Sequence, residues 1–364
     1  MAHRVTLIPG DGIGPDVVEA ARRAVDATGV GVEWDVREMG AGPLATGGQA
    51  LPDGTVASIR GTGVALKGPI ETPAGAEVRN ANVALRQQLD LFANVRPCRL
   101  YPGVPSRYED VDLVVVRENT EDVYTGIEFE VGTVEVKELI RFLEDSTGVR
   151  IREDSGISVK SISGGGSERI VRFAFEEARR GRRTKVTAGH KANIMKFSDG
   201  LFLEVARRVA AQHPAIGFED RIIDALCMQL VQAPERFDVL VLPNMYGDIV
   251  SELGAGLIGG TGVAPGAHLG DEVAVFEATH GTAPELVGRD RANPVGVLLS
   301  ATMLLRHLGE DEAGDRLERA VEAVIADGTD VTPDLRAPGD DRPPAGTATM
   351  ADAVIERLRA ASVE

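Results

Sequence analysis

The sequence of 364 residues is poor in cysteine and in aromatic residues, and it has no apolar run long enough to cross a membrane. Its two cysteines, Cys98 and Cys227, lie far apart and match no metal-binding spacing, so we expect a reduced protein without a disulfide framework. The first residues also lack the charged region and the apolar run of a signal peptide. These absences predict a soluble, cytoplasmic protein without a membrane span.

Positive charge is also scarce. The chain has 39 basic and 56 acidic residues, which gives a net charge of −17 and a pI near 4.9. Nucleic acids and anionic membranes both require a basic surface, so the composition argues against either as a partner. A local cluster of arginines can still bind a small anionic substrate within one cleft.

Short apolar runs alternate with longer amphipathic segments along the chain. Strands are predicted at residues 5–9, 111–116, 185–190 and 237–243, and helices at residues 16–28, 166–180 and 199–213. This alternation predicts an α/β fold with a mostly parallel sheet, and the length favours two domains. Residues 122–163 break the rhythm. They are polar, strand-like at both ends and helical near residues 136–145, as expected of an arm or an inserted subdomain.

The segment PGDGIGP at residues 9–15 is rich in glycine, follows a predicted strand and precedes a predicted helix. Glu33 and Asp35 lie near the offset at which a dinucleotide-binding fold places its ribose-binding acid. The third glycine, however, comes one residue too early for that motif. A tight turn from strand to helix, with Pro15 in the first helical turn, is therefore the preferred interpretation.

Three arginines, Arg79, Arg86 and Arg96, lie within residues 79–97, a segment whose apolar positions suggest burial. Arginine cannot lose its charge to suit an apolar site, so these residues indicate that an anion is bound.

Two acidic residues follow the predicted strand at residues 237–243. Asp248 and Glu252 are four residues apart and therefore share one face of a helix. Two carboxylates at the carboxyl end of a buried strand suit Mg²⁺ or Mn²⁺, although a solvated acidic face would give the same pattern. Asp224, in an otherwise apolar segment, is a third candidate ligand or else a satisfied core residue.

Tyr124 and Lys191 are candidates for proton transfer. Lysine shifts its pKa readily when it is desolvated or lies near a cation, so Lys191 can act as a base or a proton donor. Each residue taken alone could equally be structural.

Taken together, the motifs resemble one family of enzymes along most of the chain. The motifs are LIPGDGIGP, LKGPIETP, NVALRQQLDLFANVRP, VVVRENTEDVYTGIE, HKANIMKFSDG, NMYGDIVSELGAGLIGG, FEATHGTAPELVGRDRANP and LLSATMLLRHLG. They resemble those of the isocitrate/isopropylmalate dehydrogenases, which are metal-dependent β-decarboxylating dehydrogenases acting on malate-like 2-hydroxy acids, and most of all those of the isocitrate branch.

The resemblance implies roles for individual residues. Those implied for substrate binding are Asn80, Asn82, Arg86, Arg96 and Arg117, where the arginines clamp carboxylates as bidentate forks. Those implied for Mg²⁺ or Mn²⁺ are Asp248, Glu252 and the Asp224 of a partner subunit. Lys191, contributed across a dimer, is implied to relay the proton of the substrate hydroxyl, and Tyr124 to protonate the enolate that forms after carbon dioxide leaves.

The resemblance also implies a coenzyme site. Its residues are Thr72, His280, Gly281, Glu285, Leu286 and Asn293. The family members that use NADP carry a lysine and a tyrosine where this chain has Glu285 and Leu286, and they grip the 2′-phosphate with residues aligned to Pro333 and Ala337. A carboxylate at residue 285 would accept hydrogen bonds from both ribose hydroxyls and would repel a phosphate, so NAD is predicted.

At two positions the chain differs from the usual residues of isocitrate dehydrogenases, and these differences bear on the substrate and the metal. Asn80 stands where isocitrate dehydrogenases usually carry a serine that contacts the distal carboxylate, and Glu252 stands at a position that is usually aspartate. The predicted reaction is NAD-dependent oxidative decarboxylation of isocitrate to 2-oxoglutarate. The alternatives are the same chemistry on homoisocitrate, tartrate, isopropylmalate or a phosphonate analogue of isocitrate, and a non-catalytic regulatory subunit.

The resemblance finally implies an architecture. A large domain is expected from residues 1–91 and 259–364, and a small domain from residues 92–121 and 164–258. Residues 122–163 are expected to form a clasp that joins two subunits into a homodimer with shared active sites.

Overall fold

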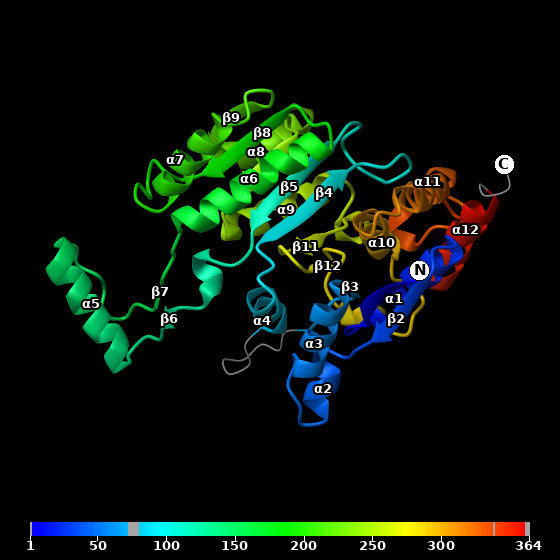
Figure 1. Cartoon of the computed structure of the whole chain (residues 1–364), viewed down its shortest axis with the longest axis horizontal. Coiled ribbons are helices and arrows are strands. Elements are labelled where there is room, and N and C mark those ends of the chain that lie inside the picture. The colour runs from blue at the N-terminus through cyan, green and yellow to red at the C-terminus, as the bar shows by residue number, and fades with distance from the viewer. Residues whose placement is uncertain (1, 72–79, 338, 361–364) are drawn as a thin grey trace.

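One large sheet runs through the whole molecule between layers of helices (Figure 1). The computed structural model describes residues 2–71, 80–337 and 339–360. The strand order is β2-β1-β3-β12-β11-β4-β5-β10-β8-β9. The strands are β1 (His3–Ile8), β2 (Val32–Val36), β3 (Val64–Lys67), β4 (Ala93–Arg99), β5 (Asp112–Glu118), β8 (Lys185–His190), β9 (Gly217–Ile222), β10 (Val239–Leu242), β11 (Ala267–Leu269) and β12 (Ala274–Phe276).

The sheet is parallel toward both edges and antiparallel at its centre. The pairs β12/β11, β11/β4 and β4/β5 run antiparallel, and the other pairs run parallel. The prediction of a mostly parallel α/β sheet is therefore confirmed, with an antiparallel centre that the helix pattern did not indicate. In the order of the sheet, the first five strands, β2, β1, β3, β12 and β11, come from the predicted large domain. The other five, β4, β5, β10, β8 and β9, come from the predicted small domain. The domain boundary itself stays a prediction.

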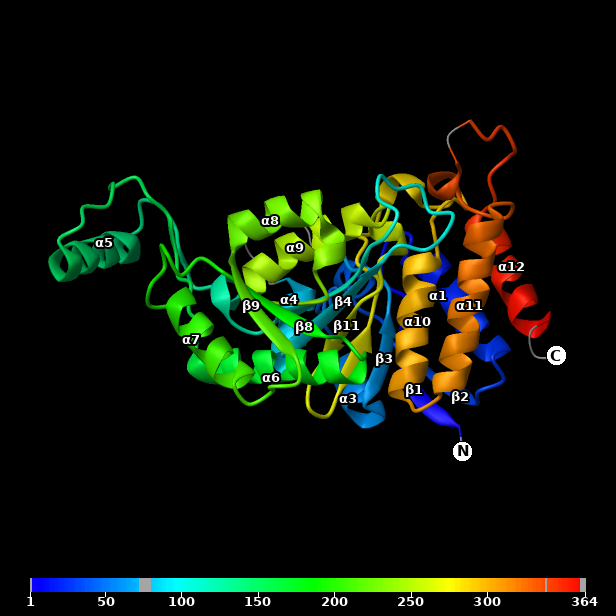
Figure 2. The same cartoon turned by 90° about the horizontal axis from the view of Figure 1, so that it is seen from above.

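Helices cover both faces of the sheet. In the half that contains β8 and β9, α8 and α9 lie on one face and α6 and α7 on the other (Figure 2). The helices are α1 (Gly14–Ala27), α2 (Ala41–Ala45), α3 (Asp53–Thr62), α4 (Ala81–Gln88), α5 (Val134–Thr147), α6 (Gly164–Arg180), α7 (Asp199–Ala210), α8 (Ile223–Gln232), α9 (Asn244–Leu257), α10 (Val295–His307), α11 (Asp311–Asp327) and α12 (Thr347–Ala360). Within the described ranges, no helix has the length and apolarity needed to traverse a bilayer.

The glycine-rich segment at residues 9–15 is a tight turn. Gly10 and Gly12 have φ angles of +78° and +61°, which only glycine adopts at little cost. The amide of Ile13 donates to the carbonyl of Thr282 at 3.0 Å, so the turn packs against the segment that follows β12. Helix α1 starts at Gly14 with Pro15 in its first turn. The preferred interpretation of this segment is confirmed.

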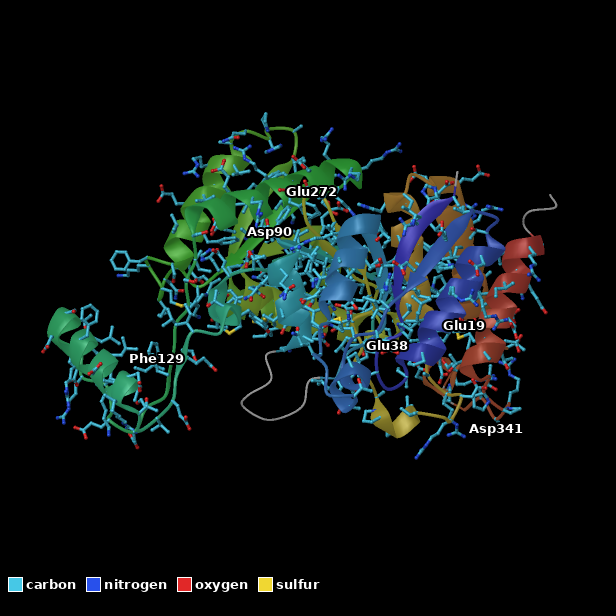
Figure 3. The ribbon with its side chains drawn as sticks, turned by 60° about the horizontal axis from the view of Figure 1, so that its bottom comes forward. Glu19, Glu38, Asp90, Phe129, Glu272 and Asp341 are labelled. Atoms are coloured by element: carbon cyan, nitrogen blue, oxygen red, sulfur yellow. The ribbon has the colours of Figure 1, made fainter. Side chains whose placement is uncertain are left out.

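Residues 122–163 begin against helix α9, and beyond residue 125 they project from the body of the molecule (Figure 1). They form the short 3₁₀ helix η1 (Asp122–Thr125), the two-stranded sheet of β6 (Glu128–Phe129) and β7 (Ile157–Ser158), and helix α5. Figure 3 shows Phe129 on this arm, far from the central sheet. The predicted short helix between strand-like ends is confirmed. Its role as a clasp between subunits stays a prediction.

Candidate active site

Arg117, at the carboxyl end of β5, lies at the centre of the site. Its side chain is only 1% exposed and is held by helix α9, which follows β10. The Nε and NH2 groups donate to Asn244 Oδ1 at 3.0 and 2.7 Å, and NH1 donates to Asp248. A Cβ atom built on Gly247 would lie 2.5 Å from Arg117 Cγ, so the absence of a side chain at Gly247 lets the arginine cross the helix.

Tyr124 reaches the same carboxylate from η1. Its hydroxyl donates to Asp248 Oδ2 at 2.5 Å, and the guanidinium carbon of Arg117 lies 4.8 Å from its ring centre. Burial and the hydrogen bond to Asp248 raise the pKa of Tyr124, so the phenol keeps its proton at neutral pH. Burial alone would raise the pKa of Asp248, but the charge of Arg117 and the hydrogen bond from Tyr124 lower it. A neutral proton donor and an ionised carboxylate therefore meet here.

Asp122 holds η1 in place. It adopts a φ angle of +69° and is fully buried. Its carboxylate accepts hydrogen bonds from the amides of Val123 at 2.8 Å and Met245 at 3.1 Å. The second bond ties η1 to the first turn of α9 and thereby fixes Tyr124 beside Asp248.

Arg96 and Arg86 supply the unpaired positive charge of the site. Arg96 on β4 donates from Nε to Asn94 Oδ1 at 2.8 Å, whereas its buried NH1 has no partner among the described residues. Arg86 on α4 forms no side-chain hydrogen bond or ion pair with them either. Desolvation and the nearby charge of Arg117 lower the pKa of Arg86 to about 10. A buried guanidinium without a partner is costly, so these arginines are suited to bind carboxylates.

A buried polar network extends from Arg96 through Asn94 to His268 and Glu277. Asn94 donates to His268 Nδ1 at 3.1 Å, and His268 Nε2 lies 2.6 Å from Glu277 Oε1. Glu277 also pairs with Lys67 of β3. Despite its burial, the charge of Lys67 and the hydrogen bond with His268 hold the pKa of Glu277 well below its usual range. Desolvation lowers the pKa of His268 to about 3, so its imidazole is neutral.

The predicted metal ligands do not form one group within the described part of the chain. Asp248 and Glu252 lie one turn apart on α9, but Asp224 pairs with Lys191 at 2.5 Å and is 68% exposed. No cluster of three acidic, histidine or cysteine residues suits a metal ion among the described residues. The two carboxylates on α9 fit the hard oxygen ligands that Mg²⁺ and Mn²⁺ prefer, and the other ligands of such an ion would be water, the substrate or a residue of another chain.

Lys191 is separate from the pair of Tyr124 and Asp248. It follows β8, and its amide donates to Asp199 Oδ2 at 2.6 Å. Among the described residues its ammonium group is paired with Asp224 and not with Tyr124 or Asp248. The structure therefore separates the predicted catalytic and metal-binding residues into two groups, one around Arg117 and one around Lys191.

Asn80 and Asn82 lie at the start of α4. Asn80 is the N-cap, and its Oδ1 accepts hydrogen bonds from the amides of Asn82 at 2.9 Å and Val83 at 3.3 Å. Within the described residues, no hydrogen bond uses its Nδ2 group as a donor. Asn82 Oδ1 is buried without a partner among the described residues, which suits a ligand that donates a hydrogen bond.

Five of the six predicted coenzyme residues lie on the segment after β12. Glu285 and Leu286 are in the 3₁₀ helix η4 (Pro284–Leu286), where Glu285 is exposed. His280 Nε2 is buried without a partner among the described residues and can bind a ligand. Gly281 is exposed, with no atom within 4 Å of a Cβ built on it.

Two of the predicted coenzyme residues, Asn293 and Thr72, do not present a free polar group to a ligand in the described part of the chain. Asn293 uses its amide within the chain, since Nδ2 donates to Asp334 at 2.8 Å and Oδ1 accepts from the amide of Val295 at 2.9 Å. Thr72 lies outside the described residues.

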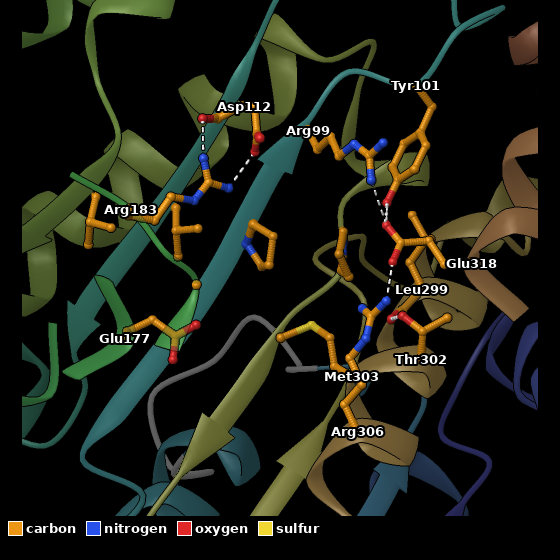
Figure 4. A pocket seen from close by; sticks show the side chains of 15 residues that line it. Arg99, Tyr101, Asp112, Glu177, Arg183, Leu299, Thr302, Met303, Arg306 and Glu318 are labelled. Carbon is orange, nitrogen blue, oxygen red and sulfur yellow. Dashed lines mark hydrogen bonds and ion pairs between the residues drawn. The ribbon is translucent and has the colours of Figure 1, made fainter. Parts of the chain in front are cut away.

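A pocket lies on the face of β4 opposite to Arg96, and Figure 4 shows its charged lining. Arg99 of β4 donates to Glu318 at 3.0 Å, and Arg183 donates to Asp112 at 2.5 Å. These arginines are neutralised by carboxylates of the chain itself, in contrast to Arg96. The group of residues around Arg117, with the unpaired guanidinium groups of Arg86 and Arg96, is therefore the candidate active site.

Several residues of the site were not indicated by the sequence analysis. They are Lys67, Asn94, Asn119, Asn244, His268 and Glu277. Asn94 could have been found, because it lies two residues before Arg96 in a strand and must share its face. The others are brought to the site by strand order and by the packing of α9, which no local pattern reveals.

The buried histidine gives a prediction about stability. The folded state keeps His268 neutral down to about pH 3, whereas the unfolded chain protonates it near its ordinary pKa of 6.5. The unfolded state therefore binds more protons in this window, and the free energy of unfolding falls as the pH drops, by up to about 1.4 kcal/mol per pH unit from this group. Urea denaturation at a series of pH values should show that the free energy of unfolding of H268Q declines less steeply as the pH drops. Glutamine can keep the hydrogen bonds of His268 without titrating. Parallel plots of unfolding free energy against pH for the wild type and H268Q would contradict the view that His268 is neutral in the folded state.

Comparison with known proteins agrees with the geometry. Residues 4–354 match the family model described as isocitrate/isopropylmalate dehydrogenase. The chain is 45% identical over 334 residues to the human isocitrate dehydrogenase [NAD] subunit alpha, mitochondrial, covering 91% of this chain and 85% of that protein. It is 44% identical over 328 residues to a mitochondrial regulatory subunit of isocitrate dehydrogenase [NAD] from Dictyostelium discoideum, covering 89% and 84%. The crystal structure of isocitrate dehydrogenase from Methylococcus capsulatus superposes with a TM-score of 0.90 at 48% identity, covering 98% and 99% of the two chains.

Proposed function

The chain belongs to the isocitrate/isopropylmalate dehydrogenase family, and from this premise we propose that it converts isocitrate to 2-oxoglutarate and carbon dioxide with NAD as the oxidant. The observation that carries the proposal is the convergence of Arg86, Arg96 and Arg117 beside the ionised Asp248, with Arg96 NH1 left unpaired. A cluster with surplus arginine charge and a carboxylate fits a polycarboxylate substrate and a divalent cation.

Binding and orientation of the substrate fall to the arginines. Arg86 and Arg96 each present donors without a partner in the described chain, so each can pair with a carboxylate. Arg117 is already held by Asn244, which keeps its guanidinium in one orientation before the substrate arrives.

The metal ligands would be Asp248 and Glu252 of one chain and Asp224 of a second copy. When bound, Mg²⁺ or Mn²⁺ supplies a Lewis acid that polarises the substrate oxygens, and NAD supplies the hydride acceptor. Asp248 would exchange part of its contact with Arg117 for the cation.

Two side chains would move protons. As the neutral amine, Lys191 would take the proton from the substrate hydroxyl while the hydride leaves, and it would thereby become an ammonium ion. Tyr124 would then donate its phenol proton to the carbon from which carbon dioxide has departed, and its raised pKa keeps that proton available at neutral pH.

Coenzyme choice gives a testable prediction. Exposed Glu285 would accept hydrogen bonds from the ribose hydroxyls of NAD and would repel the 2′-phosphate of NADP. Because a like-charge contact costs several kcal/mol, we expect kcat/KM for NAD to exceed that for NADP by at least about a hundredfold. Steady-state kinetics with both coenzymes measure the ratio of kcat/KM for NAD to kcat/KM for NADP. The E285Q variant should have a smaller ratio. A preference for NADP would contradict the assignment of NAD as the coenzyme.

Asn80 bears on the substituent at carbon 3 of the substrate. Its oxygen caps α4, so only the Nδ2 donor remains for a ligand. A donor suits a carboxylate, as in isocitrate or homoisocitrate, or a phosphonate, and it does not suit the apolar group of isopropylmalate.

A homodimer is also part of the proposal. Large apolar side chains are exposed on the surfaces near Lys191 and on α8, α9 and the arm, as expected of an interface. They are Phe197 (95% exposed), Ile249 (56%), Met228 (52%) and Phe142 (65%). Two of the relatives named above are subunits called alpha and regulatory, so a hetero-oligomer is the alternative that native mass spectrometry must test. The cytoplasmic location stays a prediction.

The deciding experiment is NADH formation by the purified chain with Mn²⁺ and NAD. Isocitrate is compared with homoisocitrate, isopropylmalate, tartrate and a phosphonomethyl malate. The highest kcat/KM for isocitrate would support the proposal, and a higher value for another malate would leave only the family chemistry. Absence of turnover with every malate would favour a regulatory subunit.

A further inference from the structure

Asn94 lies in the middle of a row of polar side chains that crosses three strands. In the antiparallel register it is directly opposite His268 of β11 on one side and Arg117 of β5 on the other. Residues directly opposite in a sheet share one face, and Arg96, two residues along β4, shares it too. The row thus connects His268 with two of the substrate-binding arginines.

Hydrogen bonds fix the orientation of each group in this row. His268 Nδ1 accepts from the amide groups of Asn94 and Asn119, each at 3.1 Å. The imidazole proton is therefore on Nε2, which donates to Glu277 at 2.6 Å. Asn119 also donates to the carbonyl of Leu91 at 2.8 Å, which leaves little freedom around the ring.

The same bonds determine which atom of Asn94 faces Arg96. Because Asn94 donates its Nδ2 group to His268, its Oδ1 is left to accept the Nε proton of Arg96 at 2.8 Å. A flipped amide would place its oxygen against the Nδ1 lone pair and its nitrogen against a cation. His268 thereby sets the orientation of Asn94, and Asn94 holds the Nε edge of Arg96.

The guanidinium that Asn94 holds has a buried NH1 group without a partner among the described residues. Arg96 as a whole is 7% exposed. Gly266, on the segment before β11, leaves room for the side chain, since a Cβ built there would lie 3.2 Å from Arg96 Cδ. The direction of the free NH1 group therefore depends on the contact with Asn94.

We propose that His268 is a positioning residue, which acts through Asn94 to aim the free NH1 group of Arg96 at a carboxylate of the substrate. The proposal rests on the proposed function in one respect, namely that Arg96 binds the substrate.

The first test compares H268L with H268Q. Leucine removes the acceptor for Asn94 and the donor to Glu277, whereas glutamine can supply both. H268L should raise the KM for the malate substrate by about tenfold or more, as the loss of an orienting partner does in other sites, and should change kcat and the KM for NAD much less. H268Q should restore the KM to within about threefold of the wild-type value. Equal effects of H268L on kcat and on both KM values, without rescue by H268Q, would overturn the proposal.

The second test places the same change in an R96Q background. If His268 acts through Arg96, adding H268L should change the KM for the substrate by less than about twofold, since the group it positions is already gone. A further tenfold increase would show that His268 acts by another route and would overturn the proposal. Where H268L does not fold, H268N takes its place, because its shorter side chain cannot reach Asn94 and Glu277 together.

Failure of the proposed function would be seen in the wild-type protein and would not decide the role of His268. If another malate is the substrate, the variants are compared with that malate, since all of them carry the shared carboxylates. If none is turned over, the Nε–H signal of Arg96 is followed by NMR in protein labelled with ¹⁵N-arginine and is assigned by its loss in R96K. The signal should move in H268L and stay in place in H268Q. An unmoved signal in H268L would overturn the proposal.

Discussion

Replacement of Gly247 by alanine is expected to lower kcat/KM by about a hundredfold, the scale of loss when a reacting group is displaced by about 1 Å. A Cβ atom at Gly247 would lie 2.5 Å from Cγ and 2.6 Å from Cβ of Arg117. Arg117 is 1% exposed and cannot move into solvent, so its guanidinium would shift away from Asn244 and Asp248. Steady-state kinetics with isocitrate and NAD would measure the loss.

Gly256 provides a matched control on the same helix. No atom lies within 4 Å of a Cβ built on Gly256, so the alanine fits there without any shift. Because alanine is the better helix former, G256A should keep its activity and gain up to about 1 kcal/mol of stability. Full activity of G247A, or an equal loss in both variants, would refute the view that Gly247 makes room for Arg117.

The fold could be predicted in part because buried strands and amphipathic helices have clear periodicities. Residues 111–116 and 185–190 were expected as strands and correspond to β5 and β8. The antiparallel centre could not be expected. The strands β11 and β12 have three residues each, too short for a periodic pattern, and they pair with strands far away in sequence. Pairing at such distances is decided by packing of the whole sheet, not by local propensity.

The site divides along the same lines. Asp248 and Glu252 could be read as one face of a helix, since their spacing is local. That Tyr124 would share the carboxylate of Asp248 required the fold, because η1 and α9 are brought together by Asp122 and Met245. Chemistry that depends on spacing within one element was visible in the sequence, and chemistry that depends on contacts between elements was not.

Lys191 and Asp248 lead to the second large prediction. The two residues do not contact each other in one chain, and Lys191 pairs with Asp224 instead. If Lys191 transfers a proton and Asp248 binds the metal, K191Q and D248N should each lower kcat by about a thousandfold, within the range that acid–base groups and metal ligands contribute. Kinetics of the separately purified variants test this step.

A hybrid dimer of the two variants should recover activity. One subunit carries K191Q and the other D248N, and the hybrid is isolated with two different affinity tags. If each site takes Asp248 from one subunit and Lys191 from the other, one of the two sites is free of both changes. The hybrid should then show about half the wild-type kcat per dimer. A site built within one chain would recover nothing.

The control hybrid pairs K191Q with D224N. Lys191 and Asp224 form an ion pair at 2.5 Å in the same chain, so both would be presented together to the neighbouring site. Each site of this hybrid receives one altered residue, and its activity should stay as low as that of the single variants. Recovery with D248N but not with D224N would assign Lys191 and Asp224 to one side of a shared site and Asp248 to the other. Recovery in both hybrids, or in neither, would contradict that division.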